Sequence, residues 1–496
     1  MNYPVWQLGV PGGLLIAFIA IVHVFVSHFA IGGGAYLVVT ERKAYRENDS
    51  ELLAYVRQHS KFFALLTIVF GAVTGVGIWF TIGLVGPEAT SSLIHTFVWG
   101  WAIEWVFFFV EIAAALIYAY QWDSLDRRTH QIVGWIYFVA AWASLFIING
   151  IITYMLTPGR WLQTKAFWDG FFNPTYFPSL VMRTFFTVAL AGVFGLITAI
   201  ELRSPAKEKV IRWAGTWLAA GIVLLPVAGY WYFSKFPQFS KDYITGFLPA
   251  TQHAFRLGLV CAALALLFAT VFALLKPQWM RRPIMTLLMI ACFGTLATGE
   301  YIREFLRKPW VINGYIYAND VRAAEVNPDG PPLGMPARAK WLRVPPQEDV
   351  AYGQQVFALQ CGSCHSVDGY RAIKPKIVGW DERFAAAIAP NLHLTRGTMP
   401  PFAGDPRDAA ALGKYLASIA PPATTTVSVG HDSFNRRCAL CHTIGGAVRP
   451  LSIAGSDSES IDAMLQQLDQ IVPQMPAFTG TETERRALAE WLSTQK

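Results

Sequence analysis

Two short stretches near the C-terminal end of the sequence repeat the same arrangement of reactive residues: 361–365 reads CGSCH and 438–442 reads CALCH. In C-x-x-C-H, two thiols form thioether links to a haem and the histidine binds its iron. Zinc would need two further ligands at suitable spacing, and a redox dithiol would need a βαβ context. The repeat therefore predicts two covalently bound c haems. The attaching thiols are Cys361, Cys364, Cys438 and Cys441, and the iron ligands are His365 and His442.

A methionine beside proline follows each pentad by about 35 residues, Met399 in TMPPF and Met475 in QMPAF. A lone methionine is more often packing material than a ligand. Because the same residue recurs at the same place, we predict Met399 and Met475 as the second axial ligands. His393 and Met464 are the alternatives.

A helical pattern follows each Met-Pro, over 409–419 and 484–494, with the similar strings ALGKYLASI and ALAEWLSTQ. Pentad, Met-Pro and helix recur in order, which indicates an internal duplication with a period of about 75 residues. The region resembles two class I cytochrome c domains in tandem, and we assign them to 348–421 and 422–496. The Pro- and charge-rich stretch 318–347 is the predicted linker.

The first three hundred residues are of a different kind. The chain is 54% hydrophobic with a mean hydropathy of +0.36, more apolar than an ordinary soluble enzyme. Stretches of about 20 apolar residues, long enough to cross a bilayer, follow one another. The predicted spans are 12–39, 62–84, 93–120, 132–154, 181–200, 214–232, 254–275 and 284–301.

Along the chain, loops that are rich in Lys and Arg alternate with loops that hold few basic residues. The rich loops carry Arg42, Lys43, Arg46, Arg57, Lys61, Arg127, Arg128, Arg203, Lys207, Lys209, Arg212, Lys276, Arg281 and Arg282. By the positive-inside rule these loops are cytoplasmic. We therefore expect a multi-pass protein of the bacterial cytoplasmic membrane, with both termini and the cytochrome domains on the periplasmic side, where c haems are attached. The formal charge of +7 then reflects topology and predicts no nucleic-acid partner.

Ionisable residues inside the spans are costly and therefore mark candidate sites for metal or proton chemistry. They are His23, His28, Glu104, Glu111, Glu300 and Glu304. His28 follows His23 by five residues and faces another side of the helix, so a hydrogen-bonded packing role is preferred to iron ligation. His95 has the same two interpretations.

Several segments, in order, resemble the larger subunit of cytochrome bd oxidases. They are HVFVSHFAIGGGAYLVVTE from position 23, FGAVTGVGIWFTIG from 70, AIEWVFFFVE from 102, ASLFIINGI around 149 and EFLRKPW at 304–310. The resemblance implies that His23 ligates one haem of an oxygen-reducing pair, that Glu304 ligates the other, and that Glu104 lies beside that pair. Arg307 of the E-x-x-R-x-P-W motif is the expected partner of haem propionates.

The second carboxylate on the Glu104 helix is Glu111, one residue closer to Glu104 than the family spacing. The two could relay protons to a reduction site. Two ligands of the family's quinol-linked b haem are missing, since Phe186 stands for the histidine and Gly258 for the methionine. The family's long quinol-binding loop is reduced to about twenty residues, 233–253.

The sequence thus predicts an all-α protein: a polytopic bundle of about eight spans (1–317), the linker and two small cytochrome domains. We expect a cytochrome bd-like oxidoreductase that passes electrons from a periplasmic donor, such as a cytochrome c, through two c haems to one or two b- or d-type haems that reduce O₂. A second bd-like subunit or a larger respiratory complex are candidate partners, beside membrane lipid. An electron-transfer subunit without O₂ chemistry, or a reductase of nitric oxide, are the alternatives.

Overall fold

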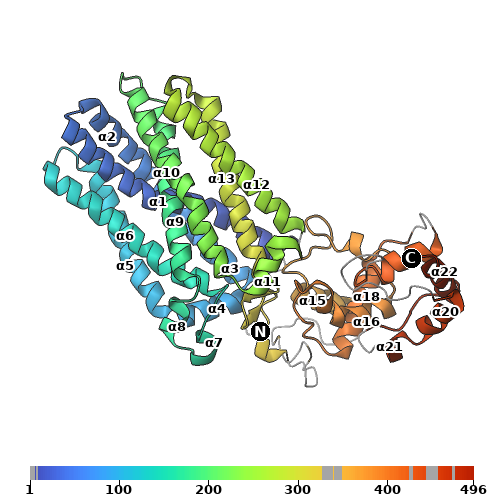
Figure 1. Cartoon of the computed structure of the whole chain (residues 1–496). Coiled ribbons are helices and arrows are strands. Elements are labelled where there is room, and N and C mark those ends of the chain that lie inside the picture. The colour runs from blue at the N-terminus through green and yellow to red at the C-terminus, as the bar shows by residue number, and fades with distance from the viewer. Residues whose placement is uncertain are drawn as a thin grey trace.

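The computed structural model describes residues 6, 9–247, 249–326, 334, 339, 349–423, 428–442, 456–471 and 475–495. A bundle of long helices forms one part of the molecule, and a smaller helical module is attached at one end of it (Figure 1). The N-terminal end of the chain lies at that same end (Figure 1).

Eight helical stretches are long and apolar enough to cross a membrane, as predicted. Their elements are α1 (Gly12–Glu47), α2, η1 and α3 (Ser50–Ala64, Leu65–Gly71 and Ala72–Val85), α5 (Val98–Tyr120), α6 (Arg127–Tyr154), α9 (Tyr176–Ala199), α10 (Lys207–Ser234), α12 and η3 (Pro249–Phe268 and Ala269–Leu275), and α13 (Arg282–Phe305). The second stretch begins twelve residues earlier than the predicted start at 62, because Asp49 caps α2 by accepting from Leu52 N (2.9 Å). The third begins later than the predicted 93, since α4 (Pro87–Thr96) is a separate helix.

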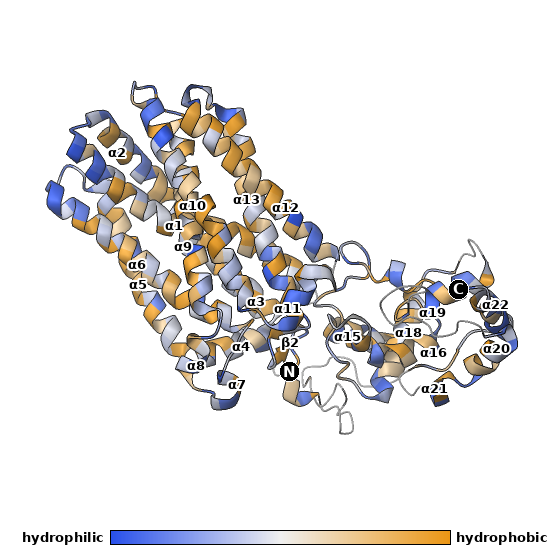
Figure 2. Ribbon diagram, viewed as in Figure 1, coloured by the Kyte–Doolittle hydropathy of each residue, from blue (hydrophilic) through white to orange (hydrophobic). Residues whose placement is uncertain are grey.

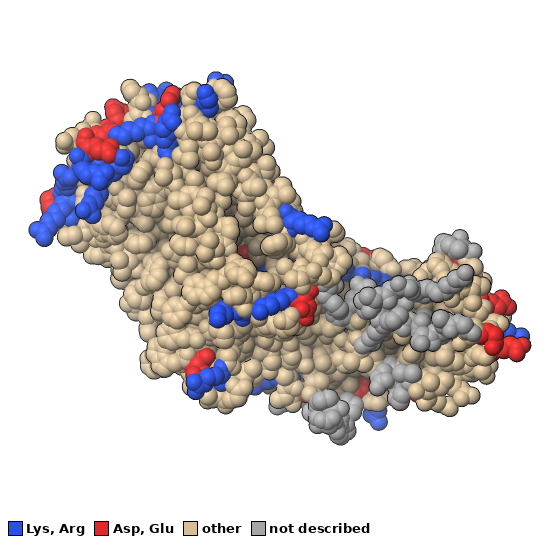
Figure 3. Space-filling model, in the orientation of Figure 1, with Lys and Arg blue, Asp and Glu red and all other residues tan. Residues whose placement is uncertain are grey.

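The basic loops meet at one end of the bundle. Figure 3 shows Lys and Arg side chains gathered where α2 lies, away from the C-terminal module. Ion pairs hold these loops together, among them Lys209 to Asp49 (2.6 Å) and Arg282 to Glu201 (2.7 Å). The alternation of basic residues along the sequence thus corresponds to two chemically different ends, as the positive-inside pattern requires.

Small residues let the central helices approach closely. A Cβ added to Gly32 of α1 would collide with the carbonyl of Thr187 in α9, and one added to Gly221 of α10 would lie 2.7 Å from Ala189 Cα. Most of α9 is therefore buried, whereas α3, α5 and α12 present exposed apolar side chains. Figure 2 shows apolar residues, in orange, along the helices of the bundle, and such a composition suits contact with lipid.

Short elements close the end of the bundle that faces the module. They are α4, α7 (Trp161–Thr164), α8 (Phe167–Phe171), α11 (Gln238–Asp242), η2 (Tyr243–Phe247), η5 (Ala323–Glu325) and a hairpin of β1 (Trp310–Ile312) and β2 (Ile316–Tyr317), while η4 (Pro277–Trp279) lies in the loop before α13. The hairpin is the one departure from the all-α prediction within the described residues. Asn313 fixes it to the bundle by donating to Met155 O (2.9 Å, backbone) and Leu156 O (3.1 Å, side chain).

The chain after the hairpin also packs on the bundle. Asp320 accepts from the N–H groups of Glu88 (2.7 Å) and Ala89 (3.0 Å) at the start of α4, and Arg322 pairs with Glu88. Residues 318–326, predicted to begin the linker, thus pack on both parts, because Val321 is also buried in the core of the first cytochrome domain. Most of the rest of the predicted linker lies outside the described residues.

The C-terminal module contains two domains built on one plan. The first has α15 (Val350–Gln360), η6 (Lys374–Lys376), α16 (Glu382–Ile388), η7 (Ala389–Asn391), α17 (His393–Arg396) and α18 (Pro406–Ile419); the second has α19 (Val429–Arg437), α20 (Ser458–Gln466), α21 (Leu468–Ile471) and α22 (Glu482–Ser493). In each, a glycine eight residues before the first cysteine lets the first helix cross the last. A Cβ on Gly353 would lie 2.8 Å from Tyr415 Cβ, and one on Gly430 would lie 2.6 Å from Trp491 Cβ.

The last helix of each domain also begins in the same way. A capping box opens α18 at Asp405 and α22 at Thr481, each six residues after the Met of the Met-Pro pair. Position by position, the two domains repeat a helix crossing, a cysteine motif and a helix start. The internal duplication predicted from the sequence is therefore visible in three dimensions.

Candidate haem-binding sites

His23 of α1 has one ring nitrogen committed to the protein. Its Nδ1 lies 3.1 Å from Thr74 Oγ1, whose own hydroxyl hydrogen is directed to Phe70 O (2.8 Å). The Thr74 oxygen therefore accepts from Nδ1–H, and the lone pair of His23 resides on Nε2. This tautomer suits a haem ligand, since a metal-binding histidine generally donates its other N–H to the protein.

His28 is placed differently. Its Nδ1 donates to Val24 O (2.9 Å) in the preceding turn, and its Nε2 lies 3.4 Å from Arg183 Nη1 of α9. The ring also packs against Phe186 at 5.7 Å between centroids. With both nitrogens beside polar neighbours, the geometry favours the packing role over iron ligation.

Arg183 is a charged residue in a predicted span that the sequence analysis overlooked. It is buried, donates to Ser179 Oγ (3.4 Å), and interacts electrostatically with Glu300 and Arg303 of α13. Arg303 donates to Glu300 (2.8 Å), so this cluster joins α1, α9 and α13 through charge pairing. The signal was present in the sequence, because an arginine two residues inside an apolar span is itself unusual.

Glu304, at the end of α13, is held by the two basic residues of its own motif. Arg307 donates to one carboxylate oxygen, and Lys308 Nζ lies 3.2 Å from the other. Arg307 is 4% exposed and also donates to Val311 O (3.0 Å). Its Nε is buried with no hydrogen-bond partner in the part of the chain that the structure describes. An unpaired guanidinium N–H beside the predicted ligand fits an acidic group such as a haem propionate.

His23 and Glu304 lie on helices that touch, with Phe25 of α1 packed on Phe293 of α13 at 5.4 Å. No cluster of three or more His, Cys, Asp or Glu side chains suited to one metal ion occurs among the described residues. That His23 and Glu304 each ligate the iron of a different haem stays a prediction from the resemblance.

Glu104 and Glu111 lie two turns apart on α5, and they interact electrostatically. Ser144 of α6 donates to Glu111 (2.5 Å). Residues seven apart share a helix face, so the two carboxyl groups form a row along the bundle. At a rise of 1.5 Å per residue the two lie about 10 Å apart along α5, so a proton would pass between them through intervening water or polar side chains.

Phe186 and Gly258, which the resemblance puts in place of the family's quinol-linked haem ligands, both lie close to other side chains. Phe186 packs on His28, and a Cβ on Gly258 of α12 would already lie 2.6 Å from Thr298 Oγ1 of α13. The shortened loop folds as α11 and η2 over the Glu304 motif, with Ser240 Oγ donating to Leu306 O (2.7 Å) and Tyr243 OH to Lys308 O (3.2 Å).

The two pentads have the same backbone geometry. Cys361 N donates to Phe357 O and Cys438 N to Phe434 O, both at 2.8 Å. In each pentad the backbone N–H of the histidine donates to the backbone carbonyl of the first cysteine at 2.9 Å. Burial raises the pKa of the Cys361 and Cys438 thiols to about 12, so neither has the thiolate character of a redox dithiol.

His365 resembles His23 in its tautomer. Its Nδ1 donates to Arg371 O (3.2 Å), which leaves the Nε2 lone pair for iron. His393 has the same arrangement, with Nδ1 donating to Pro390 O (2.9 Å), whereas Met464 packs in the core of the second domain. Met399 and Met475 are both half-buried, each three residues before a phenylalanine, Phe402 or Phe478. The Met399 and Met475 assignment stays a prediction.

The first pentad lies directly against the membrane domain. Gly13 N, at the start of α1, donates to Ser363 O (3.5 Å). The Arg371 guanidinium lies 4.4 Å from the ring centre of Phe305, the residue after Glu304. The carbonyl that orients His365 and the side chain that reaches the Glu304 motif thus belong to one residue.

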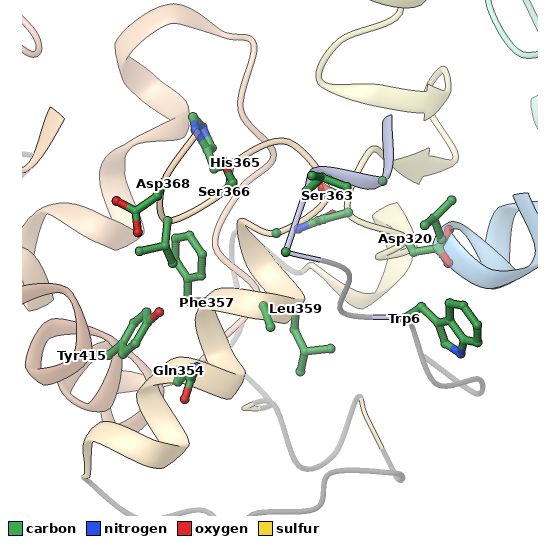
Figure 4. A pocket seen from close by; sticks show the side chains of 18 residues that line it. Trp6, Asp320, Gln354, Phe357, Leu359, Ser363, His365, Ser366, Asp368 and Tyr415 are labelled. Atoms are coloured by element: carbon green, nitrogen blue, oxygen red, sulfur yellow. The ribbon is translucent and has the colours of Figure 1, made fainter. Parts of the chain in front are cut away.

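A cavity of about 370 Å³ occupies part of this junction. Figure 4 shows its walls, with Trp6 and Asp320 from the membrane domain opposite Phe357, Ser363 and Tyr415 of the first cytochrome domain. Burial raises the pKa of Asp320 to about 7, although the hydrogen bonds that it accepts from Glu88 N and Ala89 N act in the opposite direction. The junction therefore combines direct contact at the pentad with a partly open cavity beside it.

Comparison with known proteins finds two families in the chain. Residues 14–236 match the family described as cytochrome bd terminal oxidase subunit I. Residues 348–416 and 425–492 match the family described as cytochrome C oxidase, cbb3-type, subunit III. No curated protein matches the chain. The solved structure of bd oxidase from Geobacillus thermodenitrificans is similar in fold, with a TM-score of 0.52 and 15% identity over 61% of this chain and 88% of that one.

The fold, the cysteine motifs and these matches define a membrane haem oxidoreductase. Within that class, the chain carries a cytochrome bd subunit I domain followed by two cytochrome c domains of the cbb3 subunit III family.

Proposed function

We propose that this protein is a bd-like terminal oxidase fed by cytochrome c, in which electrons from a periplasmic donor pass through the cytochrome domains to a membrane site that reduces O₂. The observation that carries the proposal is the contact of the first cytochrome domain with the membrane domain beside the Glu304 motif, through Ser363 with Gly13 and Arg371 with Phe305. It supports electron delivery to the membrane domain from its outer end.

Haems supply the one-electron chemistry and the open coordination position at which O₂ is reduced. The chain's own residues hold them: Cys361, Cys364 and His365, with Met399, in the first domain; Cys438, Cys441 and His442, with Met475, in the second; His23 and Glu304 in the membrane. Arg307 offers its buried N–H to a propionate. Glu104 and Glu111 pass protons along α5, since reduction of O₂ consumes four.

The identity of the electron donor is inferred from the features in which this chain differs from the bd family. Phe186 and Gly258 cannot ligate iron, and the loop that would admit quinol is a short cover over Leu306 and Lys308. The cytochrome domains lie at the end of the bundle opposite the basic loops (Figure 3). The positive-inside rule puts the basic loops in the cytoplasm and therefore the cytochrome domains in the periplasm. We therefore place the donor, a soluble cytochrome c or a partner complex, on the periplasmic side.

The test is O₂ uptake by the purified, haem-loaded protein with two donors in turn: ascorbate plus a soluble cytochrome c, and a reduced quinol. Uptake with the cytochrome alone supports the proposal, and uptake with quinol contradicts the interpretation of Phe186 and Gly258. Uptake with neither, together with an absence of CO binding by the reduced protein, would instead identify an electron-transfer subunit.

A further inference from the structure

We propose that the two cytochrome domains act in a fixed order: electrons enter at the second domain (428–495) and reach the membrane domain only through the first (349–423). This inference rests on the proposed function for the direction of flow. It adds the point at which electrons enter. The observations behind it are the two junctions that join the membrane domain, the first cytochrome domain and the second.

The first junction seats the first domain on the membrane domain. Besides the contacts of Ser363 and Arg371, Tyr243 OH of the shortened loop lies 3.2 Å from both Lys308 O and Gly397 O, so that one hydroxyl bridges the Glu304 motif and the first domain. The Lys308 side chain is 13% exposed and lies 3.2 Å from Glu304, so its charge is held at the same end of α13. Contacts from η2, α1 and α13 thus hold the first pentad at the membrane site.

The second junction seats the second domain on the first. Arg437, the residue before Cys438, is 9% exposed and donates to Asp381 of the first domain (3.0 Å) and to Thr479 (2.6 Å). Thr479 Oγ1 lies 3.1 Å from Asp381, and the Arg437 guanidinium lies 5.4 Å from the ring centre of Phe384. One buried arginine therefore connects the second cysteine motif to α16 of the first domain.

The residues between the paired cysteines give the order. In the first pentad, Ser363 contacts α1 of the membrane domain. In the second, Leu440 packs against the hydrophobic core of the first domain. Each pentad thus faces the next body on the way to the membrane, and the polar contacts of Arg437 and Thr479 cross from the second domain to Asp381 of the first.

The balance of the reaction fits such a path. Electrons leave a cytochrome donor one at a time, so four donor molecules are oxidised for each O₂, which takes up four protons and becomes two waters. A one-electron path of two domains in series carries these electrons without a two-electron step. The second domain lies farthest from the bundle (Figure 1) and is therefore the one that a large soluble protein can reach most freely.

The test uses rapid mixing with reduced cytochrome c in the absence of O₂, and visible absorbance reports which haems become reduced. In a variant with Cys438→Ser and Cys441→Ser, we expect the donor to reduce neither the first-domain haem nor the membrane haems at the parent rate. With Cys361→Ser and Cys364→Ser, we expect the second-domain haem to be reduced normally while the membrane haems stay oxidised. Parent-rate reduction of the first-domain haem in the former variant would overturn the order.

A milder pair of variants covers the case in which loss of a haem unfolds its domain. Arg371→Ala removes the contact with Phe305 while leaving both pentads intact, and the exposed Arg383 of α16 provides the control Arg383→Ala. We expect several-fold slower reduction of the membrane haems in Arg371→Ala, with both c haems reduced at the parent rate, and no change in the control. Equal rates in both would overturn the proposed first junction.

The same measurement separates this inference from the proposed function. Because the reduction is followed without O₂, the order can be established even if the parent protein consumes no O₂. In that case the proposed oxidase activity fails and the order stands.

Discussion

The glycine at each cytochrome helix crossing allows a sharp test of the duplicated fold. A Cβ at Gly353 would lie 2.6 Å from the carbonyl carbon of Ala411 and 2.8 Å from Tyr415 Cβ, and it would collide with the Ala411 oxygen. Backbone atoms cannot rotate away as side chains do, so in Gly353→Ala the helices α15 and α18 must separate.

The size of the effect follows from two opposing contributions. Overpacking of this kind costs up to about 3 kcal/mol, whereas replacing a helical glycine by alanine contributes about 1 kcal/mol of stability. The net loss of about 2 kcal/mol is large against the roughly 4–10 kcal/mol expected for a domain of about 70 residues. It corresponds to a Tm lowered by roughly 8–16 °C.

The assay is thermal unfolding of the haem-loaded protein followed by circular dichroism in the Soret region, with limited proteolysis and haem staining to assign the fragment that unfolds first. Gly430→Ala should destabilise the second domain by a similar amount. Gly229→Ala in α10, where a Cβ would meet nothing within 4 Å, is the control. A Tm for Gly353→Ala within 2 °C of the control would refute the reasoning.

Three further predictions concern the sites. Met399→Ala and Met475→Ala should each keep the covalent haem but open a coordination position, so that the reduced protein binds CO at a c haem, measured by its difference spectrum; unchanged CO binding would point to His393 or Met464. Glu304→Gln should lower the membrane haem content without altering the c haems, which a pyridine haemochrome assay separates. Because burial raises the pKa of Asp320 to about 7, the folded state holds that proton more tightly than the unfolded state, and stability is lost as pH rises from about 4 to about 7. Asp320→Asn should therefore lose less stability than the parent over this range, by the order of a few kcal/mol, in denaturant titrations at several pH values.

Much of the architecture was predictable because it depends on local chemistry. A thioether-linked haem needs two thiols and a histidine within five residues, so its motif is contiguous and its repetition reveals the duplication. A membrane span needs about 20 apolar residues in one run, and all eight were found. Glycine and capping residues then recur at fixed distances from the pentads.

The remaining features depend on contacts between residues far apart in the chain. The docking of 318–326 needs Asp320 at the start of α4, more than two hundred residues earlier, and the role of Arg183 depends on His28 and Glu300 from two other helices. Nothing in the Pro-rich composition after the last span distinguishes a packed segment from a free one.

The sequence alone determined which helices can cross a membrane and predicted which residues bind haem, because both follow from residue type and short spacing. It left open which cytochrome domain meets the membrane domain. Only the tertiary structure decided that, since the answer depends on Ser363 facing α1 and Leu440 facing the first domain's core. The two pentads are chemically alike, and what distinguishes them is the surface against which each one packs.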